Sequence, residues 1–552
     1  MPLLLAGLGA APFDDPGEGM HAEIARELLR AGGALTLTLS GVPYVDKPPL
    51  LYALLAAAFS VAGPSEAAAR AVSALAGLLA VGVTAWLGAR LGGARTGFVA
   101  GLALLSSLGF FVYARYVRPD ALFVALLALG FALALSGLME ERPIRVAAGL
   151  AVFGLAALAK DPLGVLAPPL AIGAALALAG RVRPVGRWLP WPGVMLAVGL
   201  AFGWWVVAEA ATPGFAWYTI VDNHVLNVVH ARYFPDEDVP LSAAEFAMVA
   251  LLGATPWVVP AAGVVVRLAR RRAWRETAEI PWIALALWAM GVLGLTALSS
   301  FRLPHYGLPA YPAVALLAAR GWRDLGVRWL ATVHAVVLGG LALACGLAWL
   351  GDGSAFLTGV LGATDVATRK SALAMGAVPP WSAFRPFVGA AALALAGGAL
   401  GLAVAAARRA RTLAVYATVV ALALLLPSAA GALSLVSAHR AVKGIAEEVR
   451  QRAAPEDVVA HEGPIENAGA FEWYSGRRPV MVDGRRSVLG FGATRPQARD
   501  SFWDDEELSR AWSGPRRVWL VTGRSPERSV VARLGAARLV AVGGGRRLYA
   551  NR

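Results

Sequence analysis

Long runs of apolar side chains recur along nearly the whole chain of 552 residues. A transmembrane helix needs about 20 predominantly apolar residues to cross the hydrocarbon core of a bilayer. Gly and Pro interrupt several runs, but both residues are tolerated in transmembrane helices. The clearest runs cover residues 71–91, 121–138, 196–211, 244–266, 282–298, 387–407 and 411–433. They predict a polytopic α-helical membrane protein with roughly 12 to 13 spans. A hydrophobic fraction of 58% agrees, since a soluble domain could not bury that much apolar surface.

The net charge of +14 comes largely from arginines in short loops between the predicted spans. This distribution is typical of cytoplasmic loops in membrane proteins and removes the need for a nucleic-acid partner. The arginine-rich loops cover residues 90–95, 142–145, 181–187, 267–272, 320–328 and 408–411. The alternate loops are then extracytoplasmic: 12–48, 115–120, 160–161, 212–243, 300–303, 351–386 and the tail from His439. Most acids, histidines and aromatic residues that could do chemistry lie on this second side.

The tail differs from the rest of the chain in composition. It is polar and rich in arginine, with a predicted helix over 441–452 and predicted strands over 458–460, 480–482, 517–522 and 546–549. About 110 residues is an ordinary domain size. We therefore expect a transmembrane domain over 1–438 and a small extracytoplasmic α/β domain over 439–552.

The first extracytoplasmic loop contains a short amphipathic helix, predicted over residues 18–30. Ile24, Ala25 and Leu28 fall on one face, while Glu23 and Glu27 fall on the other. A helix of this kind beside a membrane typically lies in the plane of the interface.

Acids and cations cluster at the ends of the predicted spans. Asp15, Glu18 and Asp120 are candidate catalytic carboxylates, although helix capping explains acids in such positions equally simply. Lys47, Lys160 and Arg302 are candidate ligands for a phosphate, with interfacial snorkelling as the plain alternative. An anionic leaving group requires cations, an acceptor hydroxyl can use a base, and an oxocarbenium-like sugar benefits from a carboxylate. Together these clusters therefore suit glycosyl transfer from a polyprenyl phosphate.

Further polar residues in the same loops are candidate substrate contacts. They are His21, Arg26, Tyr44, Asp46, Asn223, His224, His230, His305 and Tyr306. His224 and His230 lie six residues apart without a clear third ligand, which is a weak metal motif. The sequence indicates no cofactor, and a divalent metal stays an open alternative. Cys345, the single cysteine, excludes an intramolecular disulfide and a cysteine-based metal cluster.

Several of these segments resemble the bacterial lipid A aminoarabinose transferases and their ArnT-like relatives, which are related to the protein O-mannosyltransferases. The segments that carry the resemblance are Asp15 to Glu27, Gly41 to Leu50, Arg118-Pro119-Asp120, Ala159 to Pro162, Asn223-His224 and Arg302 to Pro312. The resemblance implies a GT-C glycosyltransferase fold and a polyprenyl-phosphate sugar donor, either a pentose or a hexose. It also implies transfer to a lipid A-like, glycan or protein acceptor at the periplasmic face of a bacterial inner membrane.

The resemblance further implies that Lys47 contacts the donor phosphate and that Asp120 is the second acid of the site. Arg302 stands where these relatives usually have lysine. Gly17 stands where they usually have their main acid, so either Asp15 or Glu18 is expected to replace it. Asp161 stands where glycine is usual.

Two other classes of protein remain as alternatives. A transporter or flippase would also have many spans and a few charges within them, but such proteins often show internal repeats, and none is evident here. A diverged protein that binds a polyprenyl lipid without catalysis would explain Gly17.

Overall fold

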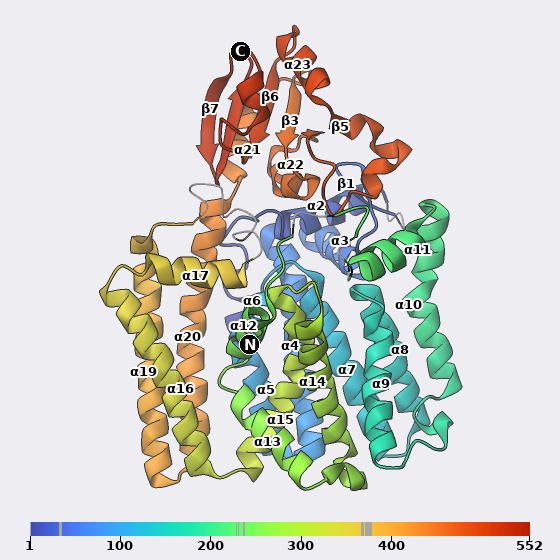
Figure 1. Ribbon diagram of the computed structural model, residues 1–552, viewed down its shortest axis with the longest axis vertical. Helices are drawn as coiled ribbons and strands as arrows, with labels where there is room; N and C mark the ends of the chain where they lie inside the picture. Colours follow the sequence, from blue (N-terminus) through green and yellow to red (C-terminus); the bar gives the residue numbers. More distant parts are fainter. Residues whose placement is uncertain are drawn as a thin grey trace.

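The computed structural model describes residues 2–32, 36–227, 229, 231–235, 238–365, 369 and 378–552. Figure 1 shows an elongated bundle of helices with a small sheet stacked on one end. Seven helices in the described part of the chain are long and apolar enough to cross a membrane. They are α4 (Glu66–Gly92), α7 (Pro119–Met139), α10 (Trp191–Ala211), α14 (Ile280–Leu298), α16 (Val327–Leu350), α19 (Trp381–Arg408) and α20 (Arg411–Arg440). The predicted polytopic α-helical fold is confirmed.

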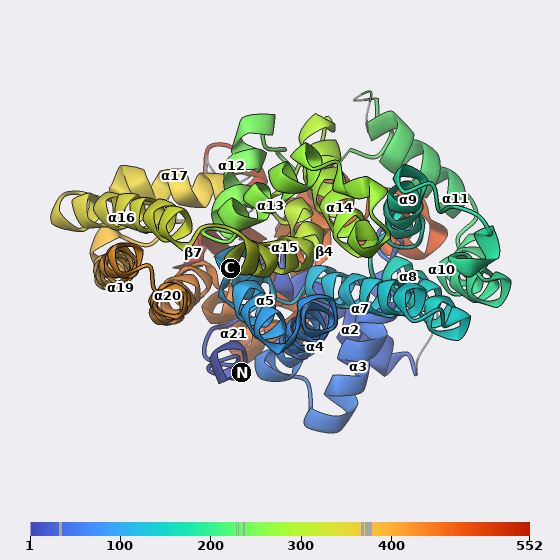
Figure 2. The ribbon, with the colours of Figure 1, turned by 90° about the horizontal axis from the view of Figure 1, so that it is seen from below.

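Shorter apolar helices complete the bundle. They are α3 (Leu50–Ala62), α5 (Ala94–Ser106), α8 (Pro143–Ala159), α9 (Leu163–Leu178) and α17 (Ser354–Thr364). Less apolar or shorter pieces lie beside them: α1 (Pro2–Leu5), α6 (Leu108–Tyr113), α11 (Phe215–Trp217) and α15 (Tyr311–Asp324). Figure 2 shows α16, α19 and α20 at one side of the bundle and α8, α9 and α10 at the other.

The run at 244–266 differs from the continuous span that its composition predicts. It forms α12 (Ala243–Gly253) and α13 (Val258–Arg270), which meet at an angle of 104°. Pro256 lies in the break, and proline cannot donate the backbone hydrogen bond that a continuous helix needs. The bend places α12 at the end of the bundle that carries the sheet.

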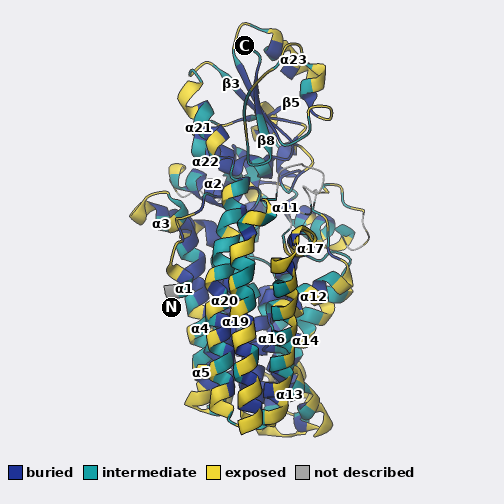
Figure 3. Cartoon of the chain, turned by 90° about the vertical axis from the view of Figure 1, so that its left-hand side faces the viewer, coloured by how far each residue is buried: buried dark blue, intermediate teal, exposed yellow. Residues whose placement is uncertain are grey.

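The two ends of the bundle differ in chemistry. The arginine-rich turns between α9 and α10, between α13 and α14, and between α19 and α20 lie at the end away from the sheet (Figure 1). Between the two ends, Leu343, Leu400 and Leu424 are exposed on the outer helices, where Figure 3 shows much exposed surface. Exposed leucines along whole helices are suited to lipid rather than water. The chain is therefore a multi-pass membrane protein.

The C-terminal part contains a six-stranded mixed sheet in the order β5-β4-β3-β6-β8-β7. β3, β4, β5 and β6 are parallel, whereas β8 pairs antiparallel with both β6 and β7. The strands are β3 (Val458–Glu462), β4 (Val480–Val482), β5 (Phe502–Trp503), β6 (Val518–Thr522), β7 (Arg538–Gly543) and β8 (Arg546–Ala550). The helices of this part are α21 (Lys443–Arg452), α22 (Gly469–Ser475) and α23 (Asp505–Ser513). All four predicted strands are present, while β5 and β7 were not predicted.

The predicted amphipathic helix is α2 (Glu18–Arg30), followed by the short hairpin β1 (Leu37–Leu39) and β2 (Val42–Tyr44). Figure 1 shows α2 lying across the end of the bundle, beneath the C-terminal part. Its polar face is not open to solvent, because α22 packs on it and buries Glu23 and Glu27. A Cβ atom on Gly19 would come within 2.5 Å of Ala470, so glycine permits this close approach.

Candidate active site

A cavity of about 1660 Å³ lies at the end of the bundle that α2 covers. On one side its wall includes Leu170 of α9 and Trp204 of α10. On the other side it includes Phe356 of α17 and Leu433 of α20. Figure 2 shows that these helices belong to opposite sides of the bundle, so the cavity extends across it. Apolar walls suit a lipid tail, and charged groups meet between them.

Asp120 is the acid at the centre of the first charged group. It lies in the first turn of α7, and its carboxylate accepts a hydrogen bond from Lys160. Arg118 Nε lies 3.2 Å from the other Asp120 oxygen, and the Arg118 guanidinium also reaches His305 Nε2 at 3.1 Å. Lys160 further lies 5.4 Å from the ring centre of Tyr306. One carboxylate is thus held between two cations in the cavity wall.

Lys47 and Asp46 form a second charged group, directly before α3. Lys47 Nζ donates to Asp46 Oδ2 at 2.5 Å, and Asn223 Nδ2 donates to Asp46 Oδ1 at 3.0 Å. Burial alone would raise the pKa of the Asp46 carboxyl, but the Lys47 ammonium and the Asn223 amide hold it below its ordinary value. Asp46 therefore remains ionised and fixes Lys47 at the cavity surface, where about 30% of the lysine side chain is exposed.

His21 of α2 faces the same centre. Its Nδ1 lies 2.8 Å from the hydroxyl of Tyr52, whose ring packs against Tyr44. Burial, together with the charges of Arg118 and Lys47, lowers the pKa of His21 to about 3. His21 is therefore neutral at physiological pH and can serve as a hydrogen-bonding group but not as a cation.

The acids of the first loop separate into three different environments. Asp15 does not line the cavity: its Oδ1 accepts from the backbone nitrogen of Ala470 at 2.8 Å, and Arg546 lies 3.6 Å from its Oδ2. Glu18 lines the cavity but is held in a buried ion pair by Arg70, whose Nε donates to it at 2.8 Å. Neither carboxylate that the sequence proposed as a replacement for the missing acid is free to act on a substrate.

Asp14, which the sequence did not single out as a site residue, does line the cavity. It is buried, and its Oδ1 accepts a hydrogen bond from the Tyr116 hydroxyl. Burial raises the pKa of the Asp14 carboxyl, while the Tyr116 hydroxyl opposes that rise. A Cβ atom built on Gly17 would lie 2.1 Å from this hydroxyl. Tyr116 therefore fills the space that a side chain at position 17 would need.

Two other predicted contacts, Arg302 and Arg26, do not line the cavity. Arg302 Nε donates to the backbone oxygen of Leu241 at 2.9 Å. Arg26 donates instead to the backbone oxygen of Trp473 at 2.8 Å, within α22. His230 lies outside the described residues.

The structure does bring together residues that are far apart in sequence. Eleven of the predicted positions line the cavity: Glu18, His21, Tyr44, Asp46, Lys47, Asp120, Lys160, Asn223, His224, His305 and Tyr306. Arg118, Asp161, Tyr116 and Asp14 join them and were missed as site residues. Arg118 and Asp161 lie within the segments Arg118-Pro119-Asp120 and Ala159 to Pro162, so the other charged residues of those segments were the available signal for both.

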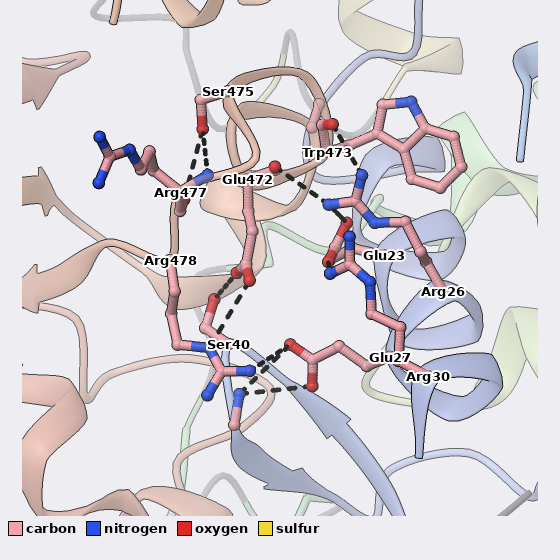
Figure 4. A network of polar contacts seen from close by, with 12 residues as sticks. Glu23, Arg26, Glu27, Arg30, Ser40, Glu472, Trp473, Ser475, Arg477 and Arg478 are labelled. Atoms are coloured by element: carbon pink, nitrogen blue, oxygen red, sulfur yellow. Dashed lines mark hydrogen bonds and ion pairs between the residues drawn. The ribbon is translucent and has the colours of Figure 1, made fainter. Parts of the chain in front are cut away.

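Figure 4 shows a polar network between α2 and α22, apart from the cavity. Carboxylate oxygens of Glu23, Glu27 and Glu472 lie within 4.8 Å of one another, a grouping that could hold a metal ion. Arg26 pairs with Glu23 at 2.5 Å, and Arg478 lies 3.5 Å from Glu27 and 3.7 Å from Glu472. These guanidinium groups supply positive charge to the carboxylates, so the network fastens α2 to α22.

The helical bundle, the covering helix and the charged cavity define a polytopic membrane protein with a polar site at one end. The family described as "Dolichyl-phosphate-mannose-protein mannosyltransferase" matches residues 46–206. That segment contains Asp46, Lys47, Arg118, Asp120, Lys160 and Asp161, which all line the charged cavity.

Among individual proteins, the ArnT crystal structure from Cupriavidus metallidurans with bound undecaprenyl phosphate is similar over its whole length. It covers 100% of this chain and 96% of its own, with a TM-score of 0.79 at 23% identity. The chain therefore has the fold of ArnT, and the predicted resemblance is confirmed at that level.

Two undecaprenyl phosphate-alpha-4-amino-4-deoxy-L-arabinose arabinosyl transferases are also similar in sequence. The protein from Aeromonas salmonicida is 26% identical over 58% of this chain and 58% of its own length. The protein from Serratia proteamaculans is 27% identical over 62% of this chain and 61% of its own. The chain thus spans about three fifths of these relatives.

Proposed function

We propose that this chain is a glycosyltransferase that moves a sugar from a polyprenyl phosphate to an acceptor. The observation that carries the proposal is the meeting of Lys47, Arg118 and Lys160 with Asp14 and Asp120 in one apolar-walled cavity. Cations stabilise the phosphate that leaves, and carboxylates serve the acceptor and the electron-poor sugar. The ArnT fold and the match to polyprenyl-phosphate-dependent relatives support this reading.

We assign the donor phosphate to Lys47, Arg118 and Lys160. Lys47 is exposed at the cavity surface, while Arg118 and Lys160 reach Asp120 from two sides. Arg302 leaves this group because the backbone oxygen of Leu241 occupies its guanidinium. Asp120 keeps the two cations in place and is the acid nearest to where a donor phosphate would bind.

We assign the acceptor side to Asp14. It is the acid of the first motif that lines the cavity without a buried arginine partner of the kind that holds Glu18. Its raised pKa suits a general base, since such groups work best with a pKa near the operating pH. The hydroxyl of Tyr116 orients its carboxylate.

The acceptor is a lipid A-like molecule, a glycan or a protein, and the sugar is a pentose or a hexose. The cavity lies at the end of the bundle opposite the arginine-rich turns. If those turns face the cytoplasm, the reaction takes place at the periplasmic face of a bacterial inner membrane. The same orientation places residues 439–552 in the periplasm.

Two variants test the assignment with the purified protein in lipid nanodiscs. Lys47→Ala is expected to weaken the binding of sugar-free undecaprenyl phosphate by about 10- to 100-fold, the value of a charge-assisted hydrogen bond. Asp120→Asn is expected to slow transfer from a labelled polyprenyl-phosphate sugar by at least about 100-fold, because Arg118 and Lys160 lose the carboxylate that positions them. Arg533→Ala and Asp505→Asn are matched controls, because both residues are exposed and lie in the C-terminal part. Unchanged binding and transfer in Lys47→Ala and Asp120→Asn would show that the proposed site is wrong.

A further inference from the structure

Asp161 and His224 form a polar pair that the proposed transfer chemistry does not use. Asp161 lies in the turn between α8 and α9, and His224 lies in a π-helical turn at Tyr218–Leu226. Both line the cavity, and both side chains remain partly exposed, at 31% for Asp161 and 47% for His224. His224 Nε2 and Asp161 Oδ2 are 3.7 Å apart, which is longer than a direct hydrogen bond.

The other contacts of the pair fix its orientation. His224 Nδ1 lies 2.5 Å from the backbone oxygen of Thr219, which can only accept, so Nδ1 carries a proton. Asp161 Oδ1 accepts from the backbone nitrogen of Leu163 at 2.7 Å. The remaining atoms, Nε2 and Oδ2, face each other across the gap. In the neutral histidine both of them are acceptors, so the pair needs a hydrogen-bond donor between them.

The surroundings place this gap beside the donor phosphate site. The charge of Lys47 acts on both members of the pair. Lys160, the residue before Asp161, is bound to Asp120. Burial alone would raise the pKa of Asp161, but its contacts with His224 and Leu163 hold it below its ordinary value, so the carboxylate is ionised. The nearby Asp161 carboxylate in turn raises the pKa of His224.

Other acids of the cavity are less open to a ligand. Asp120 is held by Lys160 and Arg118, Asp46 by Lys47 and Asn223, and Glu18 by Arg70. Asp161 instead lies 3.7 Å from its side-chain partner, so a polar atom to one side of the pair can lie within hydrogen-bond distance of both Oδ2 and Nε2. A sugar hydroxyl there would donate to Asp161 and accept from a protonated His224. A sugar amine would donate to both.

We propose that Asp161 and His224 bind a hydrogen-bond-donating group of the donor sugar, either a hydroxyl or an amine, and so select which sugar is transferred. The inference rests on the proposed glycosyl transfer and deepens it. It assigns Asp161 and His224 to the sugar, while Lys47, Arg118 and Lys160 hold the phosphate.

The test compares donors and variants in the full-length protein. The donors are pentose conjugates of undecaprenyl phosphate: the complete sugar, sugars with single hydroxyls removed, and a sugar with one hydroxyl replaced by an amine. The variants are Asp161→Asn and His224→Gln, with Asp505→Asn as the exposed control. For each combination kcat/KM is measured, and the binding of sugar-free undecaprenyl phosphate is measured alongside.

The expected result is specific to the sugar. One deoxy donor loses about 10- to 100-fold in kcat/KM with the parent protein, the value of a hydrogen bond to a charged group. In Asp161→Asn and His224→Gln that loss shrinks to less than about threefold, because the contact is already absent. Binding of sugar-free undecaprenyl phosphate stays unchanged in both variants. The amine conjugate shows which of the two chemistries the gap prefers, through its kcat/KM relative to the hydroxyl donor.

Two results would overturn the assignment. If both variants discriminate between the donors as the parent does, the pair does not bind the sugar. If both variants bind the sugar-free lipid as poorly as they bind the conjugates, the pair contacts the phosphate or stabilises the fold. A parent protein that transfers no sugar from any donor would overturn the proposed function, and this inference with it.

Discussion

Individual side chains in the first loop take positions that the sequence alone does not show. Position 17 carries glycine, where the resemblance to ArnT-like proteins predicts an acid, and Tyr116 occupies the space beside it. Asp14, three residues earlier, supplies a carboxylate to the cavity and bonds to the same tyrosine. The sequence could not show which nearby acid reaches the cavity, because choosing among Asp14, Asp15 and Glu18 depends on where each side chain points.

The contact between Gly17 and Tyr116 can be tested by overpacking. Gly17→Ala forces the added methyl group against the tyrosine ring and its hydroxyl, which is expected to cost about 1–3 kcal/mol of stability. In a Tyr116→Ala background the same change is expected to cost less than about 0.5 kcal/mol, because the space is then empty. Chemical unfolding of the four proteins in detergent measures the difference. An equal cost in both backgrounds would contradict the contact.

The buried pair of Glu18 and Arg70 has a predictable energy. Arg70 also donates to the backbone oxygens of Leu8 and Ala11, at 2.7 and 2.6 Å, so it anchors the N-terminal segment. Arg70→Met leaves the Glu18 carboxylate buried and unpaired, which is expected to cost about 3–5 kcal/mol. Adding Glu18→Gln is expected to recover part of this loss, as unfolding in detergent would show. If Arg70→Met alone were as stable as the parent protein, the pair of Glu18 and Arg70 would not be an anchor.

Elements follow from the sequence more readily than their partners do. The clearest apolar runs located six of the seven long helices, all except α16, and the spacing of Glu23, Ile24, Glu27 and Leu28 predicted α2 with the observed bounds. The burial of its polar face could not be predicted, because α22 lies more than 400 residues further along the chain. The break between α12 and α13 was missed for a similar reason, since apolar composition alone does not show a bend.

The contact between α2 and α22 is expected to depend on pH. Burial, followed by the charges of Glu23 and Glu27, raises the pKa of Glu472 to about 8, and burial raises that of Glu23 to about 7. A raised carboxyl pKa means that the folded state binds the proton more tightly than the unfolded state does. The stability from these groups is therefore fully present below their ordinary pKa of 4.5 and is lost as pH rises toward 8.

Thermal unfolding at pH 6 and pH 8.5 checks this prediction. The parent protein is expected to unfold at a higher temperature at pH 6. Glu472→Gln is expected to narrow the difference in unfolding temperature between the two pH values, because its amide stays uncharged at both. The amide oxygen can still accept a hydrogen bond from Ser40. The exposed Asp505 of α23 lies outside this network, so Asp505→Asn serves as the control. If the parent protein were more stable at pH 8.5, the proposed protonation would be wrong.

At the scale of the whole molecule, the two ends of the bundle divide the work. Arginine-rich turns occupy one end, and the cavity, α2 and the sheet occupy the other. This division was visible in the sequence, because charge and apolar length depend on composition alone. The sequence could only suggest that Asp46, Asp120, Asp161 and His224 line one cavity, since this requires segments far apart in the sequence to converge.

The most direct test of the central claim follows the sugar itself. The purified protein in nanodiscs is given undecaprenyl phosphate carrying a labelled pentose or hexose, together with a bacterial lipid and glycoprotein extract. The account predicts that label appears in an acceptor while undecaprenyl phosphate is released in equal amount, and that Asp120→Asn abolishes both. The account would be contradicted if donors bind but release no sugar, whichever sugar they carry. It would also be contradicted if the protein moves unchanged donor across vesicle membranes.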